Sequence, residues 1–212
     1  MTASLPVLTL AETRVLGTLL EKQRTVPDTY PLSLNTLVAG CNQKTSRQPV
    51  LELRNADVAQ ALDALKDAGL AVEVSGSRVP RFEHRMEKVL AVPGQAAALL
   101  AVLMLRGPQT AGELRLNCER LHRFADISSV EAFLDELAGR TLVVELPRLP
   151  GARESRWSHL LSGRPTVSEA PAAIPRGCHD ELFELKARVA MLEDEIGELR
   201  GLLAGLRADL GG

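Results

Sequence analysis

An internal repeat constrains the fold of this chain more than any other feature of its sequence. Residues 57–74 (DVAQALDALKDAGLAVEV) align without a gap to residues 129–146 (SVEAFLDELAGRTLVVEL). The identical pairs are Val58/Val130, Leu62/Leu134, Asp63/Asp135, Leu65/Leu137, Leu70/Leu142, Val72/Val144 and Glu73/Glu145. Self-similarity of this kind indicates that one structural unit occurs twice.

In both copies the apolar spacing changes from the period of a helix to the alternation of a strand. In the first copy the helical face comprises Val58, Ala61, Leu62 and Leu65, and the alternating residues are Leu70, Val72 and Val74. Gly69 lies between them, where a left-handed helix cap is expected. The second copy has Thr141 at this position, so we expect its helix to end differently.

Two further helical patterns precede each copy. In the first half these helices are expected to start at Thr9, with Glu12, and at Ser33. In the second half an apolar run from Ala96 to Leu105 is followed by a start at Thr110, with Glu113, and the third helix is expected to start at Ser128, with Glu131. The pairs spaced three residues apart are capping boxes, in which each residue of the pair satisfies a backbone N–H of the other. The sequence of each half therefore predicts three successive helices, followed by strands.

A polar turn and a returning strand follow each change from helix to strand. The turns are residues 75–78 and 147–151, and the returning strands are residues 79–85 and 153–160. Three helices followed by a hairpin is the winged-helix layout, so we expect a mainly α chain with small β-hairpins (α+β). The expected parts are two tandem winged-helix domains at residues 1–88 and 89–163, a flexible linker at 164–178 and a coiled-coil helix at 179–212.

The expected C-terminal helix carries an uninterrupted heptad pattern. Its seam residues are Leu182, Leu185, Val189, Leu192, Ile196, Leu199, Leu203, Leu206 and Leu210. β-Branched residues at position a with Leu at position d favour two parallel strands, and the flanking charges of a parallel pair attract each other. We expect a parallel coiled-coil homodimer, although Gly197, Gly201 and Gly205 weaken the helix by about 1 kcal/mol each. The alternative is a helix that folds back onto its own domains.

Composition and charge limit the classes of function. Hydrophobic residues make up 45% and charged residues 25% of the 212 residues, which is typical of a globular protein, and the net charge is −2. No apolar run reaches the ~18 residues of a membrane-spanning helix. The N-terminus shows no signal peptide, so we expect a cytoplasmic protein without a membrane partner.

Sequence motifs of catalysis are missing. The chain has no glycine-rich phosphate loop, nucleophile elbow or metal-binding helix motif. Its four histidines are scattered singly, and Cys41, Cys118 and Cys178 lack the paired spacing of a zinc site. We therefore expect no enzyme activity, no catalytic residue, no metal site and no cofactor.

Four segments of the chain resemble the YceH family of bacterial proteins. They are LLEKQ (19–23), YPLSLN (30–35), CNQKTSRQPV (41–50) and RESRWSHLLSG (153–163). The resemblance covers roughly residues 7–163 and implies a tandem winged-helix fold. It supplies no catalytic residue, cofactor or ligand.

The expected third helix of each domain has the wrong charge for reading DNA. In DNA-binding winged helices this helix usually enters the major groove. Its outward residues here are Asp57, Gln60, Asp63, Lys66 and Asp67 in the first copy, and Ser129, Glu131, Asp135 and Glu136 in the second. Carboxylates repel phosphates, so a conventional repressor is disfavoured.

Basic and polar residues lie instead in a loop and on the two hairpins. The candidate nucleic-acid-binding residues are Asn42, Gln43, Lys44, Thr45, Arg47, Arg78, Arg81, Arg85, Arg153 and Arg156. These residues would contact phosphates while a wing enters a minor groove. The alternative is that the arginines pair with neighbouring carboxylates, and we expect Trp157 to belong to the core.

The sequence is therefore consistent with two functions. The first is a regulatory DNA-binding protein that uses loops and wings. The second is a non-enzymatic scaffold for protein–protein interactions, because tandem winged helices with acidic third helices also serve as protein-interaction modules, as in chromosome-segregation and condensin-associated proteins. The sequence leaves DNA, a protein and a second copy of the chain as candidate partners.

Overall fold

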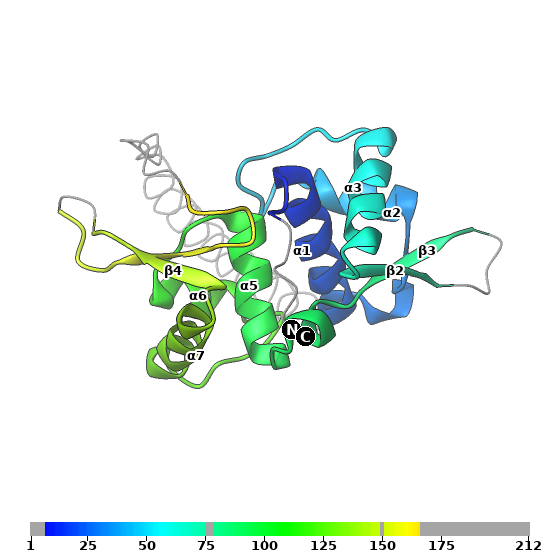
Figure 1. The fold of residues 1–212 in the computed structure, drawn as a ribbon. Coiled ribbons are helices and arrows are strands. Elements are labelled where there is room, and N and C mark those ends of the chain that lie inside the picture. The colour runs from blue at the N-terminus through cyan, green and yellow to red at the C-terminus, as the bar shows by residue number, and fades with distance from the viewer. Residues whose placement is uncertain (1–6, 75–78, 149–150, 166–212) are drawn as a thin grey trace, which may run out of the picture. The chain divides into compact units, whose positions relative to one another are not determined.

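Each half of the chain forms three helices followed by an antiparallel hairpin, which gives an α+β structure (Figure 1). The computed structural model describes residues 7–74, 79–148 and 151–165. The elements of the first half are α1 (Leu10–Thr25), the 3₁₀ helix η1 (Pro27–Thr29), β1 (Leu32–Ser33), α2 (Leu34–Cys41), α3 (Asn55–Asp67), β2 (Ala71–Val74), β3 (Arg81–His84) and α4 (Met86–Leu90). Those of the second half are α5 (Gly94–Arg106), α6 (Ala111–Asn117), α7 (Ile127–Gly139), β4 (Val143–Leu146) and β5 (Arg156–His159).

The three-stranded sheet of the first half and the two-stranded sheet of the second half share a common layout. In the first half, β3 lies between β1 and β2, and Phe82 pairs with Leu32 on one side and Glu73 on the other. In the second half, Trp157 of β5 pairs with Glu145 of β4 and forms an isolated bridge with Gln109. Gln109 immediately precedes the N-cap of α6, just as Leu32 precedes that of α2. The repeat therefore extends through the sheets as well as the helices.

Three of the four predicted helix starts are confirmed. Thr9 caps α1, Ser33 caps α2 and Thr110 caps α6, each through its side-chain oxygen. The start predicted at Ser128 is wrong, because α7 begins at Ile127 and its cap is Asp126, whose Oδ1 accepts the backbone N–H of Ser129 at 2.7 Å. Asp is as good a cap as Ser and it comes first along the chain.

The third helix of each half ends in the same way. Gly69 has φ +71° and Thr141 has φ +58°, both in the left-handed region. In each cap the next residue donates its backbone N–H to a carbonyl of the last turn, Leu70 to Leu65 at 2.8 Å and Leu142 to Leu137 at 2.9 Å. The expectation that the second helix ends differently was wrong, because Thr141 adopts the conformation that glycine adopts in the first copy.

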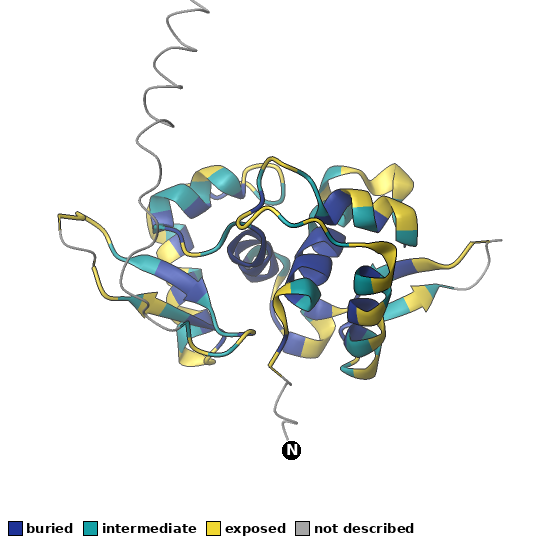
Figure 2. Ribbon diagram, turned by 90° about the horizontal axis from the view of Figure 1, so that it is seen from above, coloured by how far each residue is buried: buried dark blue, intermediate teal, exposed yellow. Residues whose placement is uncertain are grey.

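Helices α1 and α5 pack against each other at the centre of the described unit (Figure 2). Every residue of α5 from Ala96 to Leu105 is buried, because α5 also contacts α6, α7 and β5. Gly17 permits the close approach of α1, since a Cβ there would lie 3.0 Å from Cγ of Leu105. The two halves thus share one core, and the domain boundary at residues 88 and 89 stays a prediction.

The predicted coiled-coil helix and almost all of the predicted linker lie outside the described residues. The dimerisation residues from Leu182 to Leu210 therefore keep the status of a sequence prediction. Within the described part of the chain, no helix is long and apolar enough to cross a membrane.

Candidate functional site

The loop between α2 and α3 is closed by its own side chains. The Asn42 amide donates to the Leu53 carbonyl and accepts the Leu53 N–H, both at 2.8 Å. Gln43 accepts hydrogen bonds from Lys22 and Arg47. Asn42 and Gln43, both candidates for nucleic-acid contact, are thus occupied in shaping the loop.

Arg47 is buried at the base of the same loop, with 6% of its surface exposed. Its guanidinium donates to Oε2 of Glu21 at 2.5 Å and to the Gly40 carbonyl at 2.9 Å. Burial alone would raise the pKa of Glu21, but the hydrogen bond and charge of Arg47, with a contribution from Lys22, hold it below its usual value. Arg47 therefore fixes the loop to α1 and does not face solvent.

The hairpin arginines Arg81 and Arg156 occupy equivalent positions and make equivalent contacts. Arg81 donates to the Pro31 carbonyl at 2.7 Å, and Arg156 donates to the Pro108 carbonyl at 2.9 Å. Arg156 also forms an ion pair with Glu113 at 3.1 Å. These guanidiniums tie each hairpin to the segment before the second helix of its own half.

A shared segment of the returning strands carries this equivalence. The strands read RFEH at residues 81–84 and RWSH at residues 156–159. Each strand carries an arginine, an aromatic residue and a histidine, and each of these pairs with the equivalent residue of the neighbouring strand, β2 or β4. This four-residue match is visible in the sequence. It does not extend the gapless alignment of the longer repeat, because the segments between the two differ in length.

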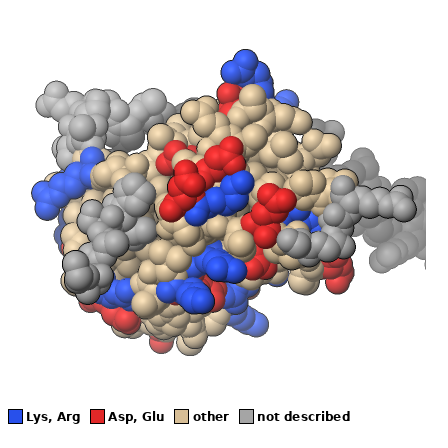
Figure 3. All heavy atoms as spheres, turned by 45° about the vertical axis from the view of Figure 1, so that its right-hand side comes forward, with Lys and Arg blue, Asp and Glu red and all other residues tan. Residues whose placement is uncertain are grey.

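The remaining basic candidates are Lys44, Arg85 and Arg153, which are exposed. In the part of the chain that the structure describes, none of the three forms an ion pair, and Thr45 beside Lys44 is also exposed. Arg78 lies outside the described residues. Figure 3 shows basic and acidic side chains interspersed on one face of the molecule, without a continuous basic stripe there.

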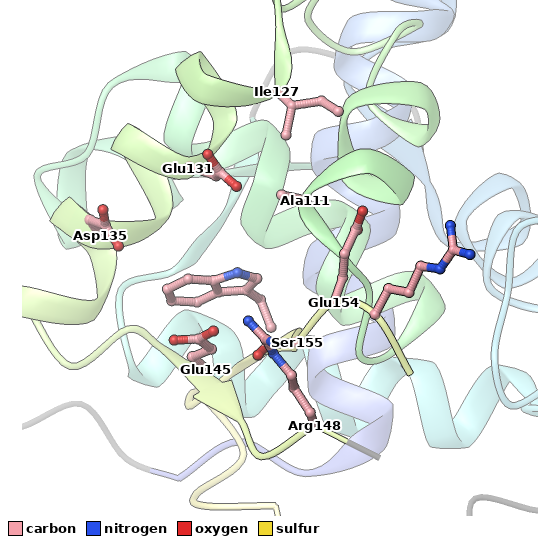
Figure 4. Close-up of a pocket in the computed structure, with 10 residues that line it drawn as sticks. Ala111, Ile127, Glu131, Asp135, Glu145, Arg148, Glu154 and Ser155 are labelled. Carbon is pink, nitrogen blue, oxygen red and sulfur yellow. The ribbon is translucent and has the colours of Figure 1, made fainter. Parts of the chain in front are cut away.

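A groove of about 370 Å³ lies between α7 and the second hairpin (Figure 4). Its lining residues are Ala111, Ile127, Glu131, Asp135, Glu145, Arg148, Arg153, Glu154, Ser155 and Trp157. Glu131 and Asp135 extend from α7, whereas Glu145 and Arg148 come from β4 and the residues after it (Figure 4). Four carboxylates and two guanidiniums give the groove a net negative charge.

None of these charged groups forms an ion pair within the described residues. With respect to the described residues, each carboxylate therefore keeps acceptor atoms for a ligand. Ile127, 44% exposed, adds apolar surface at one end of the groove. The sequence predicted that Glu131 and Asp135 are acidic residues on the outward face of the third helix. It did not predict that they lie close to the second hairpin.

Trp157 also lines the groove while it belongs to the core, as predicted. Its side chain is 9% exposed and packs in the apolar cluster of the described unit. The indole N–H donates no hydrogen bond to another described residue. Trp157 therefore supplies both an aromatic surface and an unused donor to the groove.

The two strand histidines occupy equivalent positions, but the ring nitrogens of His84 have partners whereas the buried Nδ1 of His159 has none among the described residues. Burial lowers the pKa of both His84 and His159 to about 4. His84 Nδ1 accepts the Met86 N–H, so its Nε2–H donates to Gln23 at 2.8 Å. Among the described residues, no cluster of three or more His, Cys, Asp or Glu side chains is arranged to hold a metal ion.

The two described cysteines are buried at equivalent places, at the ends of α2 and α6. Burial raises the pKa of Cys41 to about 11 and that of Cys118 to about 12. Both thiols therefore stay protonated at neutral pH and are poor nucleophiles. Cys178 lies outside the described residues.

The described residues lie in one compact unit in which three helices and a hairpin occur twice, with an acidic groove in the second half. The chain belongs to the family described as "Protein of unknown function, DUF480", which matches residues 8–152. The family resemblance found in the sequence is thereby confirmed.

Similar proteins occur in several bacteria. The chain is 68% identical over 207 residues to a UPF0502 protein of Dechloromonas aromatica, covering 96% of this chain and 97% of that protein. It is 61% identical over 212 residues to a UPF0502 protein of Burkholderia pseudomallei, covering 96% of this chain and 89% of that protein. A UPF0502 protein of Burkholderia multivorans is 59% identical over 210 residues, with the same two coverages.

Proposed function

We propose that the protein is a non-enzymatic protein-interaction module built from two tandem winged-helix units. The winged-helix interpretation is supported by three helices and a hairpin in each half, together with the common position of Leu32 and Gln109 beside the returning strand. The observation that carries the binding function is the acidic groove between α7 and the second hairpin. A winged helix that reads DNA would present basic residues there.

The internal contacts of the arginines support the same choice. Arg47, Arg81 and Arg156 donate to backbone carbonyls or to half-buried carboxylates. A guanidinium engaged in this way must break those bonds before it can contact a phosphate. Charged hydrogen bonds of this kind contribute about 1.5–3 kcal/mol each, so the exchange gains little.

Photo-crosslinking tests whether the groove binds a protein. A photoreactive amino acid placed at Ser155, which lines the groove, is expected to give one discrete protein adduct in cells. The matched control is Pro80, the residue that precedes Arg81 in the first half as Ser155 precedes Arg156 in the second. An adduct that nuclease removes, or equal protein adducts at both positions, would contradict the proposal.

DNA binding is the second candidate function. It is favoured by the exposed Lys44, Arg85 and Arg153 on the loop and the two hairpins, which form no ion pair with another described residue. The test is a salt titration of binding to duplex DNA, in which each neutralised phosphate adds about −0.9 to the slope of log K against log salt. A slope near zero, or no binding in low salt, would exclude phosphate contact.

The working unit is proposed to be a homodimer. The support is the heptad seam at Leu182–Leu210, which lies outside the described residues. Nine aliphatic residues at ~1.5–3 kcal/mol each can exceed an association cost of ~4–15 kcal/mol. A dimer would present two acidic grooves to the same partner.

A further inference from the structure

We infer that the acidic groove of the second half binds a lysine side chain of the partner protein, at the place that the chain's own Lys66 fills in the first half. The inference rests on the proposed protein-binding function and names the chemistry of the partner. It follows from comparing the two halves position by position.

In the first half an ammonium group lies among an aspartate, a glutamate and an aromatic ring. Nζ of Lys66 is 2.8 Å from Oδ1 of Asp63 and 6.0 Å from the centre of the Phe82 ring. The hydrogen bond to Asp63 and the charge of Glu73 raise the pKa of Lys66 despite its slight burial. A cation over an aromatic ring with a carboxylate beside it is a favourable arrangement for an ammonium group.

The second half keeps every part of this arrangement except the lysine. Asp135 and Glu145 align with Asp63 and Glu73 without a gap, and Trp157 takes the register of Phe82 opposite the glutamate. The residue that aligns with Lys66 is Ala138. The groove therefore offers the carboxylates and the ring while its own ammonium group is missing.

The remaining groove residues strengthen the acidic character of the second half. Glu131 and Glu154 line the groove, where the first half has Ala59 and Val79 at the corresponding positions. With Arg148 and Arg153 counted, the lining carries two more negative than positive charges. Trp157, 9% exposed, supplies a better aromatic partner for a cation than Phe82 does.

The chain offers a direct readout, because Trp157 is its single tryptophan. The full-length protein is titrated with an acetylated, amidated tetralysine peptide while tryptophan fluorescence and the anisotropy of a labelled peptide are followed. A saturable change that weakens with salt is expected, with a tetraglutamate peptide giving none. A missing or unsaturable change would overturn the inference.

Two reciprocal variants test the position of the ammonium group. Ala138→Lys supplies an internal ammonium and is expected to abolish peptide binding although it removes no carboxylate. Lys66→Ala opens the first half and is expected to raise the number of peptides bound per chain from one to two. Unchanged binding in Ala138→Lys, with its fold verified by circular dichroism, would overturn the inference.

Charge variants distinguish binding at this groove from non-specific attraction to an acidic protein. Asp135→Asn is expected to weaken tetralysine binding about fivefold, as for the loss of a partly exposed ion pair. The matched variant is Asp63→Asn, which removes the same charge at the equivalent position and should leave binding unchanged. Equal losses in both variants would show only non-specific attraction and would contradict the site.

The outcome can be separated from that of the protein-binding proposal. Crosslinking to a protein at Ser155 without any tetralysine affinity would retain the interaction function and reject lysine recognition. Tetralysine binding without a protein adduct would retain the groove chemistry and reject the interaction function. Spermidine that binds more tightly than the peptide would identify a free polyamine as the ligand and reject a partner lysine.

Discussion

At the scale of single residues, the most informative position is Thr141. A β-branched residue is rare at positive φ, where L-residues pay about 1–2 kcal/mol. Glycine removes this strain but loses more entropy on folding, about 0.5–1 kcal/mol. Thr141→Gly should therefore stabilise the protein by about 0.5–1 kcal/mol in urea unfolding.

The equivalent position in the first half provides the control for this prediction. Gly69 already occupies the left-handed region, and a Cβ added to it would meet no atom within 4 Å, so only backbone strain would oppose a side chain there. Gly69→Thr should destabilise the protein by about the same amount. A Thr141→Gly variant no more stable than the wild type would show that Thr141 is not strained.

The buried His84 and the half-buried His159 predict a dependence of stability on pH. Burial lowers the pKa of His84 and His159 to about 4, below the ~6.5 of the unfolded chain. The unfolded chain therefore binds more protons between these values, and the free energy of unfolding falls as pH drops from about 6.5 to about 4. For His84 the loss approaches about 3 kcal/mol.

The measurement is urea unfolding at a series of pH values. His84→Gln keeps a polar side chain but cannot titrate, so its stability should be lower at pH 7 and flatter toward pH 4. A wild-type profile as flat as that of His84→Gln would reject the burial argument.

At the scale of elements, the loop from Asn42 to Arg54 owes its shape to a buried ion pair. Glu21 is the carboxylate partner of the Arg47 guanidinium, whose side chain is fully buried. Removing one partner of a buried pair leaves the other charge uncompensated and costs about 3–5 kcal/mol. Glu21→Ala should show this loss in urea unfolding and open the loop to proteolysis.

The control for the loop lies three residues before Arg47. Lys44 is exposed and takes part in no ion pair with another described residue. Lys44→Ala should therefore change stability by no more than about 0.5 kcal/mol. Equal losses in Glu21→Ala and Lys44→Ala would mean that the buried pair does not hold the loop.

Helices, hairpins and loops differ in how well they could be predicted from the sequence. Apolar periodicity and caps are local signals, so the helices and hairpins were predictable, and the error at Ser128 arose because Asp126 competes for the same cap. The internal use of Arg47 and Arg81 was not predictable, because their partners Glu21 and Pro31 are far away in sequence. For the same reason, the sequence did not predict that α7 and the second hairpin line one groove.

At the scale of the whole molecule, the packing of α1 on α5 joins the two halves. A Cβ added to Gly17 would lie 3.0 Å from Cγ of Leu105, so the Leu105 side chain must shift to admit a larger residue. Gly17→Val should destabilise the described unit by about 1–3 kcal/mol, as overpacking of a core does. Gly139→Ala, where nothing lies within 4 Å, is the control and should not destabilise it.

The association state links the heptad seam to the groove. The full chain should sediment as a dimer of the 22.9 kDa protomer, and residues 1–165 alone should sediment as a monomer, because the seam lies beyond them. Two grooves joined in one dimer should also bind a peptide with two spaced lysine clusters more tightly than one with a single cluster, since the second contact is intramolecular. A dimer of residues 1–165 would place the interface elsewhere, and a monomeric full chain would remove the basis for bivalent binding.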